Sequence, residues 1–231
     1  MTLCLVTDRR RLTAGAASLE SARRCLVEQA RHAVAAGIDL IQLRERDLEA
    51  ADLAAIAGDL LRITRGTSTR LLINDRLDVA LACGADGVHL RVDSFPAAAA
   101  RRLAPPGFLI GCSVHDVSEA AAAAGADYLI AGTVFPSVSK DSGAATIGVE
   151  GLRSIVRAAS APVLAIGGIT IDRAGQVVRA GAAGIAAIGL FLTPEADFPD
   201  SCRAASLRAV ADALRHEQPT GARRSGPPDL V

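Results

Sequence analysis

The sequence predicts a single (β/α)8 TIM barrel of the α/β class, and three observations carry that prediction. The chain has 231 residues, 50% of them hydrophobic, which is enough to bury one full core. Short β-branched or leucine-rich runs alternate with longer alanine-rich segments to about residue 215. Most of the short runs are continuously apolar, as expected of parallel strands buried on both faces. We therefore expect one domain over residues 1–215.

Eight of these runs are expected to form the strands. In chain order they are Leu3–Asp8, Leu40–Arg44, Arg70–Asn74, Gly87–Leu90, Leu109–Ser113, Tyr128–Val134, Val163–Gly167 and Gly184–Ile188. Between them, apolar residues recur at helical spacing and predict helices over Ser18–Ala36, Glu49–Arg65, Arg76–Cys83, Phe95–Leu103, Val117–Ala124, Val149–Ala159 and Ile171–Ala180. Strands that each lead into a helix favour a closed barrel over an open doubly wound sheet.

A short glycine-containing phrase recurs where a helix ends and a strand begins. Its glycines are Gly37, Gly84, Gly125 and Gly181. Glycine supplies the left-handed turn that ends a helix, so we interpret these phrases as the loops at the bottom of the barrel. The opposite ends of the strands should then carry the functional residues. Residues 216–231 are rich in Pro, Gly and charge, and we expect them to form a disordered tail.

Composition argues against several classes of function. Lys plus Arg and Asp plus Glu both number 25, so no net field steers the chain toward nucleic acid or a membrane. Aromatic residues make up 3% and Trp is absent, which leaves little for stacking on nucleobases. A short apolar run followed by three arginines opens the chain, the reverse of a secretory signal, and no apolar stretch approaches the roughly 20 residues of a membrane span.

The five cysteines are scattered and form no C-x-x-C pair, which fits small buried side chains in a reducing cytosol. We expect a cytoplasmic protein that acts on small molecules, with neither nucleic-acid nor membrane partners. The sequence allows a homo-oligomer without specifying one.

Polar residues gather at the predicted strand ends. Gln42 and Arg44 alternate with apolar neighbours, so both are expected to point into the barrel. An arginine buried there needs an anionic partner. That partner is either a ligand or an internal carboxylate, with Asp8 and Asp75 as the candidates.

The next three strands end in polar residues with more than one interpretation. Asn74 and Asp75 either cap the following helix or bind a metal or a diphosphate. His89 is either a hydrogen-bonded core histidine or a site residue. Ser113 ends the fifth strand, and His115, close to a helix start, is expected to be structural.

Glycines end the last two strands. The residues concerned are Gly167, Gly168, Ile188 and Gly189. Glycine lets backbone N–H groups approach a phosphate, so these ends predict a phosphate site, with simple turns as the alternative. The segment 135–143 contains Ser137, Ser139 and Lys140, and is interpreted as a lid that offers hydroxyls and a cation or, alternatively, as a solvated loop.

Two anion sites are therefore expected on one face of the barrel. One is the glycine backbone at the last two strands. The other is formed by Arg44, Arg46, Asn74, Asp75 and Lys140. Asp75 beside cations makes most sense if Mg²⁺ bridges it to a diphosphate, because Mg²⁺ prefers one or two carboxylates plus phosphate oxygens. Cations around a departing diphosphate stabilise the charge that develops as its C–O bond breaks.

Together these motifs resemble the thiamine phosphate synthase family, which includes a thiazole tautomerase branch. They are IQLRER at 41–46, INDRLDVA at 73–80, GADGVHL at 84–90, IGCSVH at 110–115, GTVFPSVSK at 132–140 and AIGGI at 165–169. They occur in the family's order, and the resemblance covers residues 3 to 192. It implies transfer of a hydroxymethylpyrimidine group from its diphosphate to thiazole phosphate. The diphosphate leaves first, and the thiazole nitrogen captures the pyrimidine carbocation.

The resemblance also implies roles for particular residues. The pyrimidine diphosphate would be held by Gln42, Arg44, Arg46, Asn74, Ser113 and Lys140. Among these, the catalytic residues would be Arg44, Ser113 and Lys140. Further substrate contacts would come from Ser137 and Ser139, and the thiazole phosphate would be bound by Gly168, Ile188 and Gly189. Asp75 would bind Mg²⁺, and Asp93, one residue before the position of the family's second metal-binding Asp, is the candidate for the second ligand.

Several positions depart from the synthase pattern. Arg46 stands where synthases have Lys, and Gly189 follows Ile188 where they commonly have Ser. Ser94 occupies the position of the second metal-binding Asp, with Asp93 one residue earlier. Arg91 and Val92 replace a Gly-Gln pair.

The sequence around Arg46 and Arg91 is closer to the tautomerase branch. However, Thr133 stands where that branch has its proton-shuttling His, and Asp75, which the branch usually lacks, is present. Three hypotheses follow: a synthase, a metal-free isomerase acting on thiazole phosphate, and a non-catalytic binder of a phosphate ester.

Overall fold

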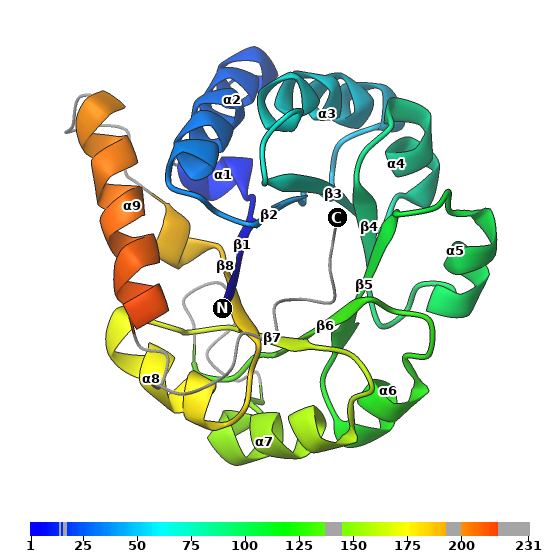
Figure 1. Cartoon of the computed structure of the whole chain (residues 1–231). Coiled ribbons are helices and arrows are strands. Elements are labelled where there is room, and N and C mark those ends of the chain that lie inside the picture. Colours follow the sequence, from blue (N-terminus) through cyan, green and yellow to red (C-terminus); the bar gives the residue numbers. More distant parts are fainter. Residues whose placement is uncertain (14, 16–17, 137–144, 193–199, 217–231) are drawn as a thin grey trace.

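The computed structural model describes residues 1–13, 15, 18–136, 145–192 and 200–216. Its strands form a closed barrel in chain order, every neighbouring pair parallel, which confirms the predicted fold (Figure 1). The strands are β1 (Thr2–Val6), β2 (Leu40–Leu43), β3 (Arg70–Asn74), β4 (Gly87–Leu90), β5 (Leu109–Val114), β6 (Tyr128–Gly132), β7 (Val163–Ile166) and β8 (Gly184–Ala187). Five strands end one or two residues before the predicted limit, because their last residues already turn into the loops.

Helices surround the barrel as an outer ring (Figure 1). They are α1 (Arg9–Leu12), α2 (Leu19–Ala35), α3 (Ala50–Thr64), α4 (Leu77–Cys83), α5 (Ala97–Leu103), α6 (Val117–Ala122), α7 (Gly148–Ala158), α8 (Ile171–Arg179), the 3₁₀ turn η1 (Gly189–Phe191) and α9 (Asp200–His216). The ranges from α2 to α8 agree with the prediction. The sequence analysis did not identify three of them: α1 and η1, which are too short to show periodicity, and α9. Of the predicted tail, residues 217–231 lie outside the described residues.

Side chains alternate between the barrel interior and the helices. The interior cluster is Cys4, Val6, Leu40, Leu72, Leu109, Tyr128, Ile130, Leu164 and Ala186. Ile41 and Leu43 belong instead to the larger cluster between strands and helices. This alternation confirms that Gln42 and Arg44 point inward, above Leu40.

The single tyrosine of the chain lies inside the barrel. Tyr128 is 5% exposed, and its ring occupies the space beside Gly111 on the neighbouring strand. A Cβ placed on Gly111 would lie 2.1 Å from Tyr128 Cζ, so this position accepts only glycine while the tyrosine is present. In a small barrel, a large side chain on one strand fills the interior space beside a glycine on the neighbouring strand.

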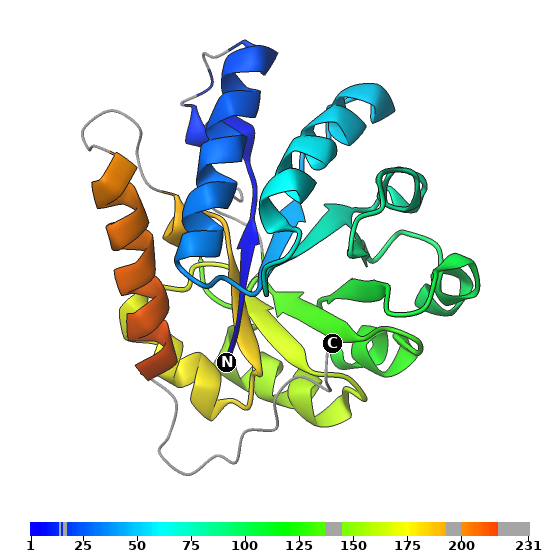
Figure 2. The ribbon, with the colours of Figure 1, turned by 45° about the horizontal axis from the view of Figure 1, so that its top comes forward.

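The predicted glycine turns lie at the bottom of the barrel, which the C-terminal end of α9 also reaches. Gly37, Gly84, Gly125 and Gly181 all have positive φ, as their interpretation as helix-ending turns requires. Helix α9 runs beside α2 (Figure 2). There Arg215 donates to the carbonyl of Gly37 and lies 3.4 Å from an Asp39 carboxylate oxygen.

Two other expectations concern thiols and membranes. Burial raises the pKa of Cys4 to about 12 and that of Cys112 to about 11, which keeps both protonated at neutral pH and fits their interpretation as small apolar side chains. Within the described residues, no helix is both long enough and apolar enough to cross a bilayer.

Candidate active site

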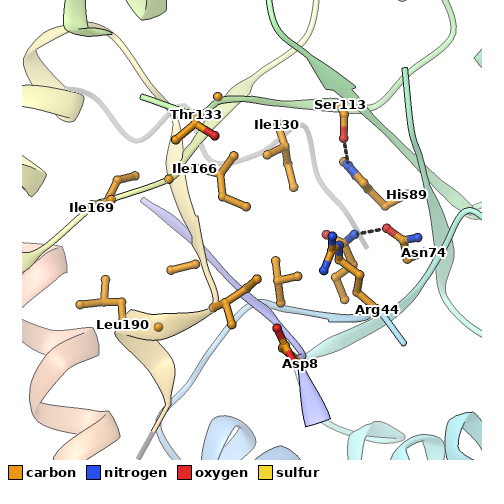
Figure 3. Close-up of a pocket in the computed structure, with 18 of the residues that line it drawn as sticks. Asp8, Arg44, Asn74, His89, Ser113, Ile130, Thr133, Ile166, Ile169 and Leu190 are labelled. Atoms are coloured by element: carbon orange, nitrogen blue, oxygen red, sulfur yellow. Dashed lines mark hydrogen bonds between the residues drawn. The ribbon is translucent and has the colours of Figure 1, made fainter. Parts of the chain in front are cut away.

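A cavity of about 690 Å³ opens at the carboxyl ends of the strands, the face where barrels of this type carry their sites (Figure 3). Every strand or the loop after it contributes to the wall. The polar side chains that line it are Asp8, Arg11, Gln42, Arg44, Arg46, Asn74, His89, Arg91, Ser113, His115, Thr133, Thr170 and Arg173. Residues far apart in sequence therefore meet around one space.

Gln42 fixes the orientation of Asn74. Both side chains are buried, and Gln42 Nε2 donates to Asn74 Oδ1 over 2.9 Å (Figure 3). With its oxygen engaged, Asn74 is left with the NH₂ group for a partner in the cavity. The N-cap of α4 is Arg76, whose side chain makes no capping bond. Asn74 is thus set as a donor toward the cavity rather than as a helix cap.

Arg44 lies half-buried on the same wall. Its backbone N–H donates to Thr7 Oγ1 at 2.9 Å, while its guanidinium forms no hydrogen bond or ion pair with any part of the chain that the structure describes. Burial lowers the pKa of Arg44, and the nearby charge of Arg46 acts in the same sense. The predicted alternative of an internal ion pair with Asp8 or Asp75 is not observed, and the cation faces the cavity.

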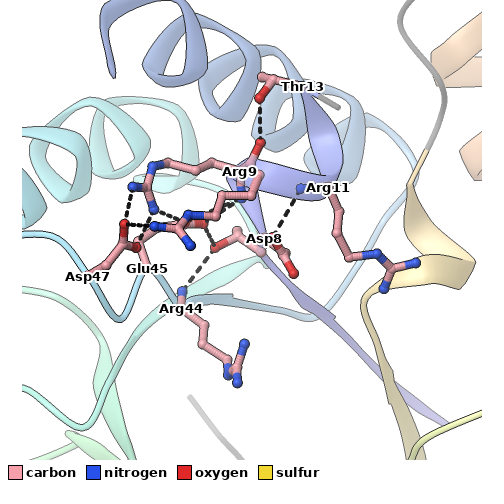
Figure 4. A network of polar contacts seen from close by, with 9 residues as sticks. Asp8, Arg9, Arg11, Thr13, Arg44, Glu45 and Asp47 are labelled. Carbon is pink, nitrogen blue, oxygen red and sulfur yellow. Dashed lines mark hydrogen bonds and ion pairs between the residues drawn. The ribbon is translucent and has the colours of Figure 1, made fainter. Parts of the chain in front are cut away.

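A buried carboxylate holds the turn that carries Arg44. Glu45 is 5% exposed and accepts a hydrogen bond from Thr7 Oγ1 at 2.7 Å and one from Arg9 Nη1 at 3.0 Å (Figure 4). Arg9 also binds Asp47, so one guanidinium bridges two carboxylates. Burial raises the pKa of Glu45. This network ties the start of α1 to the end of β2 and thereby positions the Arg44 backbone.

A hydrogen-bonded chain orients Ser113. His89 Nδ1 lies 3.1 Å from the Tyr128 hydroxyl, and its Nε2 lies 3.0 Å from Ser113 Oγ. Burial lowers the pKa of His89 to about 3 and raises that of Tyr128, so both are neutral at pH 7. In the tautomer that carries its proton on Nε2, the Tyr128 hydroxyl donates to Nδ1 and the ring N–H donates to Ser113 Oγ. In that tautomer the Ser113 hydroxyl keeps its own proton for an acceptor in the cavity.

Asp75 sits beside the cavity with an unusual backbone. Its φ is 65°, a left-handed conformation that costs a non-glycine residue about 1 kcal/mol. Ser94 Oγ donates to Asp75 Oδ1, and Arg91 Nη1 lies 3.8 Å from Oδ2. The same guanidinium binds Asp93 at 2.6 Å. Arg91 therefore stands between the two predicted metal ligands, and neither aspartate lines the cavity wall.

No cluster of three or more His, Cys, Asp or Glu side chains that could hold a metal occurs in the described ranges. Asp75 with the Ser94 hydroxyl nevertheless fits Mg²⁺, which needs only one or two carboxylates when phosphate oxygens and water complete its shell.

Glycines contribute to the wall at the ends of β7 and β8, beside the side chains of Ile166, Ile169 and Leu190 (Figure 3). Gly168 has φ 61°, and a Cβ on it would lie 2.4 Å from the Pro136 carbonyl oxygen, so the loop after β6 packs directly on it. Ile188 and Gly189 line the adjacent wall. Arg173 supports this side: it donates to the Gly168 carbonyl at 2.8 Å, and its guanidinium lies 4.9 Å from the centre of the Phe135 ring.

The structure brings most of the predicted site residues together. Those on the cavity wall are Gln42, Arg44, Arg46, Asn74, Ser113, Gly168, Ile188 and Gly189. Ser137, Ser139 and Lys140 lie outside the described residues. His115 binds Glu119 within its own turn, as expected of a structural residue.

Three residues of the site were missed at the sequence level: Arg11, Arg173 and Tyr128. Arg11 had a readable signal, since it directly follows the first strand end. The others depend on neighbours that are distant in sequence.

Comparison with known proteins identifies the family. The family model described as thiamine monophosphate synthase matches residues 3–191. The thiamine-phosphate synthase of Methanoregula boonei is 49% identical over 163 residues, which cover 70% of this chain and 76% of that protein. That of Methanoculleus marisnigri is 44% identical over 184 residues, covering 79% and 87% respectively.

A solved structure gives the same picture. The thiamine phosphate pyrophosphorylase from Pyrococcus furiosus superposes with a TM-score of 0.72 at 35% sequence identity, covering 92% of this chain and 96% of that one.

Proposed function

The chain belongs to the thiamine monophosphate synthase family, and we propose that the rim cavity is where it joins hydroxymethylpyrimidine diphosphate to thiazole phosphate. The activity is that of a transferase, with thiamine phosphate and pyrophosphate as products. One observation carries the assignment to this cavity. Arg44, Asn74 and Ser113, at the ends of β2, β3 and β5, face it from one side (Figure 3), and the glycine-containing segments after β7 and β8 line the other. Two phosphorylated substrates need two such sites around one space.

The diphosphate is assigned to the side-chain wall. Arg44 offers an unpaired cation there, Asn74 an oriented NH₂ group and Ser113 an oriented hydroxyl. When the bond between the pyrimidine methylene carbon and the diphosphate oxygen breaks, its electron pair leaves with the diphosphate. Fixed donors that meet this growing negative charge lower the barrier. The other predicted contacts on this side are Gln42, Arg46, Ser137, Ser139 and Lys140, the last as a further catalytic cation.

Mg²⁺ is assigned to Asp75, with Asp93 as the second predicted ligand. When bound, the ion would neutralise part of the diphosphate charge. Binding through both carboxylates requires Arg91 to release Asp93, because its guanidinium now holds that side chain. Asp75 is kept in place by its backbone and by Ser94.

The thiazole phosphate is assigned to the opposite wall. Gly168, Ile188 and Gly189 line it, and the backbone N–H groups of glycines, which carry no side chain, are suited to phosphate oxygens.

The test is product formation by the purified full chain. Both phosphorylated substrates are supplied with Mg²⁺, and thiamine phosphate is measured by chromatography after oxidation to its fluorescent thiochrome, with pyrophosphate measured in parallel. We expect the two products in equal amounts and none when either substrate is omitted. Arg44→Ala should lower kcat/KM by about 10² or more, the scale of losing one charge-stabilising group.

The competing hypotheses give different outcomes. A folded protein that forms no thiamine phosphate but binds thiazole phosphate would be a binder. Activity on thiazole phosphate alone that survives EDTA and Asp75→Ala would mark an isomerase. Either result would refute the synthase assignment.

A further inference from the structure

We propose that Arg11 is the cation that binds the phosphoryl group of thiazole phosphate and that Gly189 leaves the space in which its guanidinium lies. The inference rests on the proposed function and adds a residue to it that selects for a phosphorylated thiazole.

The position of Arg11 is the first argument. It belongs to α1, directly after β1, and β1 pairs with β8 in the barrel. A Cβ placed on Gly189 would lie 3.1 Å from Arg11 Nη2, 3.8 Å from Nη1 and 3.9 Å from Cζ. The first distance is shorter than an ordinary contact and the other two are ordinary contacts, so the guanidinium lies where a side chain of residue 189 would begin. Figure 4 shows the Arg11 side chain extending away from the other arginines of α1, toward the gold segment after β8.

The second argument is that the Arg11 guanidinium is available. Its neighbours Arg9 and Arg10 both bind Asp47. The Arg11 backbone N–H donates to Asp8, but its guanidinium has no hydrogen bond or ion pair within the part of the chain that the structure describes. In α1, therefore, Arg9 and Arg10 form ion pairs within the protein, whereas Arg11 lines the cavity.

The other arginines of the cavity either bind a group of the protein or lie on the wall assigned to the diphosphate. Arg173 donates to the Gly168 carbonyl, and Arg91 binds Asp93. Arg44 and Arg46 follow β2, on the wall assigned to the diphosphate. Among the described residues, Arg11 is therefore the arginine placed to bring an unpaired charge to the Ile188–Gly189 wall.

Gly189 provides the third argument. A side chain here would begin with a Cβ 3.1 Å from the guanidinium, closer than an ordinary contact, so Arg11 would have to give way. A phosphate monoester carries nearly two negative charges and three acceptor oxygens, which a planar guanidinium meets with two parallel N–H donors. Arg11, in the space left by Gly189, therefore adds a positive charge and two parallel N–H donors to the backbone N–H groups of this wall.

The experiment compares Arg11→Ala and Arg11→Lys with Arg10→Ala, a control from the same helix whose side chain binds Asp47 at the surface. Arg11→Ala should raise the KM for thiazole phosphate at least tenfold and leave the KM for the pyrimidine diphosphate within twofold. The KM of Arg11→Lys for thiazole phosphate should lie between those of the wild type and Arg11→Ala, since lysine keeps the charge but loses the paired donors. Arg10→Ala should match the wild type. With the unphosphorylated thiazole alcohol as acceptor, Arg11→Ala and wild type should perform equally.

A second variant tests the pairing with Gly189. Gly189→Ser should weaken thiazole phosphate binding on its own but add little to Arg11→Ala, because the serine acts by displacing a group already removed. Urea unfolding of each variant confirms an intact fold.

Binding of thiazole phosphate, measured by calorimetry with Mg²⁺ and pyrophosphate present, separates the two claims. Product formation by the wild type with an unchanged KM in Arg11→Ala overturns the role of Arg11 alone. Absence of product from a wild type that still binds thiazole phosphate overturns the proposed reaction, and the Arg11 claim is then judged by whether Arg11→Ala loses that binding. A wild type that neither reacts nor binds overturns both.

Discussion

His89 is neutral in the fold, and this has a consequence for stability. Burial lowers its pKa to about 3, against about 6.5 in an unfolded chain. Between these values the unfolded state binds a proton that the folded state does not, so the free energy of unfolding rises with pH across this window and falls as the solution is acidified. The slope is about 1.4 kcal/mol per pH unit, which gives about 2 kcal/mol between pH 6.5 and pH 5.

We therefore predict that His89→Gln has a flatter stability profile than the wild type from pH 5 to pH 6.5, although it is less stable at pH 7. Urea unfolding at pH 5.0, 5.5, 6.0, 6.5 and 7.0 measures this. The control is His115→Gln, which makes the same substitution at an exposed histidine. An unchanged slope in His89→Gln would show that other groups cause the acid sensitivity.

Arg91 contacts both predicted metal ligands, Asp75 and Asp93. Its ion pair with Asp93 and its approach to Asp75 engage both carboxylates, so Mg²⁺ would compete with the guanidinium for them. Partly exposed ion pairs contribute up to about 1 kcal/mol, so removing this one should lower the Mg²⁺ concentration for half-maximal activity by up to about fivefold. Arg91→Ala is predicted to show this in a Mg²⁺ titration. Arg76→Ala, which breaks an exposed pair with Asp78, is the matched control and should leave the titration unchanged.

The sequence predicted the direction of a side chain where side chains alternate between the two faces of a strand. The period of two along β2 placed Gln42 and Arg44 inside the barrel, and the structure agrees. The orientation of Ser113 was not readable, because it depends on His89 and on Tyr128, which lies 39 positions from that histidine in the chain. Contacts of this kind follow from which strands are neighbours and in what register, which only the closed barrel defines.

At the scale of elements, the strands and the helices α2 to α8 were predictable because each has a long apolar face. Helix α1 was not, since four residues are too few for a period, and its role rests on the bonds of Arg9. Helix α9 combines alanine with several charged residues, so its apolar face is weak, and it was missed despite its length of 17 residues. The predicted lid cannot be compared, because 137–144 lie outside the described residues.

Two glycines should respond oppositely to the same substitution. A Cβ on Gly111 would meet the Tyr128 ring of the next strand at 2.1 Å, so Gly111→Ala should destabilise the fold by about 2–3 kcal/mol. Gly58, inside α3, has nothing within 4 Å of a new Cβ, so Gly58→Ala should stabilise by up to about 1 kcal/mol through helix propensity. Urea unfolding measures both. Equal effects of the two changes would show that the barrel interior yields to the new methyl group.

For the whole molecule, the bottom of the barrel contributes to stability, and the top contributes to ligand binding. At the bottom, Arg215 connects α9 to the barrel: it binds the Gly37 carbonyl and approaches Asp39, whose carboxylate accepts the Leu3 N–H at 2.8 Å. At the top, Arg44 lies half-buried with no carboxylate bound to its guanidinium among the described residues, an arrangement that costs stability and is useful only to a ligand.

This division predicts that stability and activity can be changed separately. Arg215→Met should lower the free energy of unfolding by about 1 kcal/mol, the scale of one partly exposed hydrogen bond from a charged group, and leave kcat/KM within twofold of the wild type. Arg44→Met should do the reverse. It removes a desolvated cation, which raises the free energy of unfolding by about 1 kcal/mol, while thiamine phosphate formation falls by about 10² or more. Urea unfolding and initial rates on the same preparations test both at once. If Arg44→Met were destabilised as much as Arg215→Met, the Arg44 guanidinium would have a structural partner, and its assignment to the departing diphosphate would have to be withdrawn.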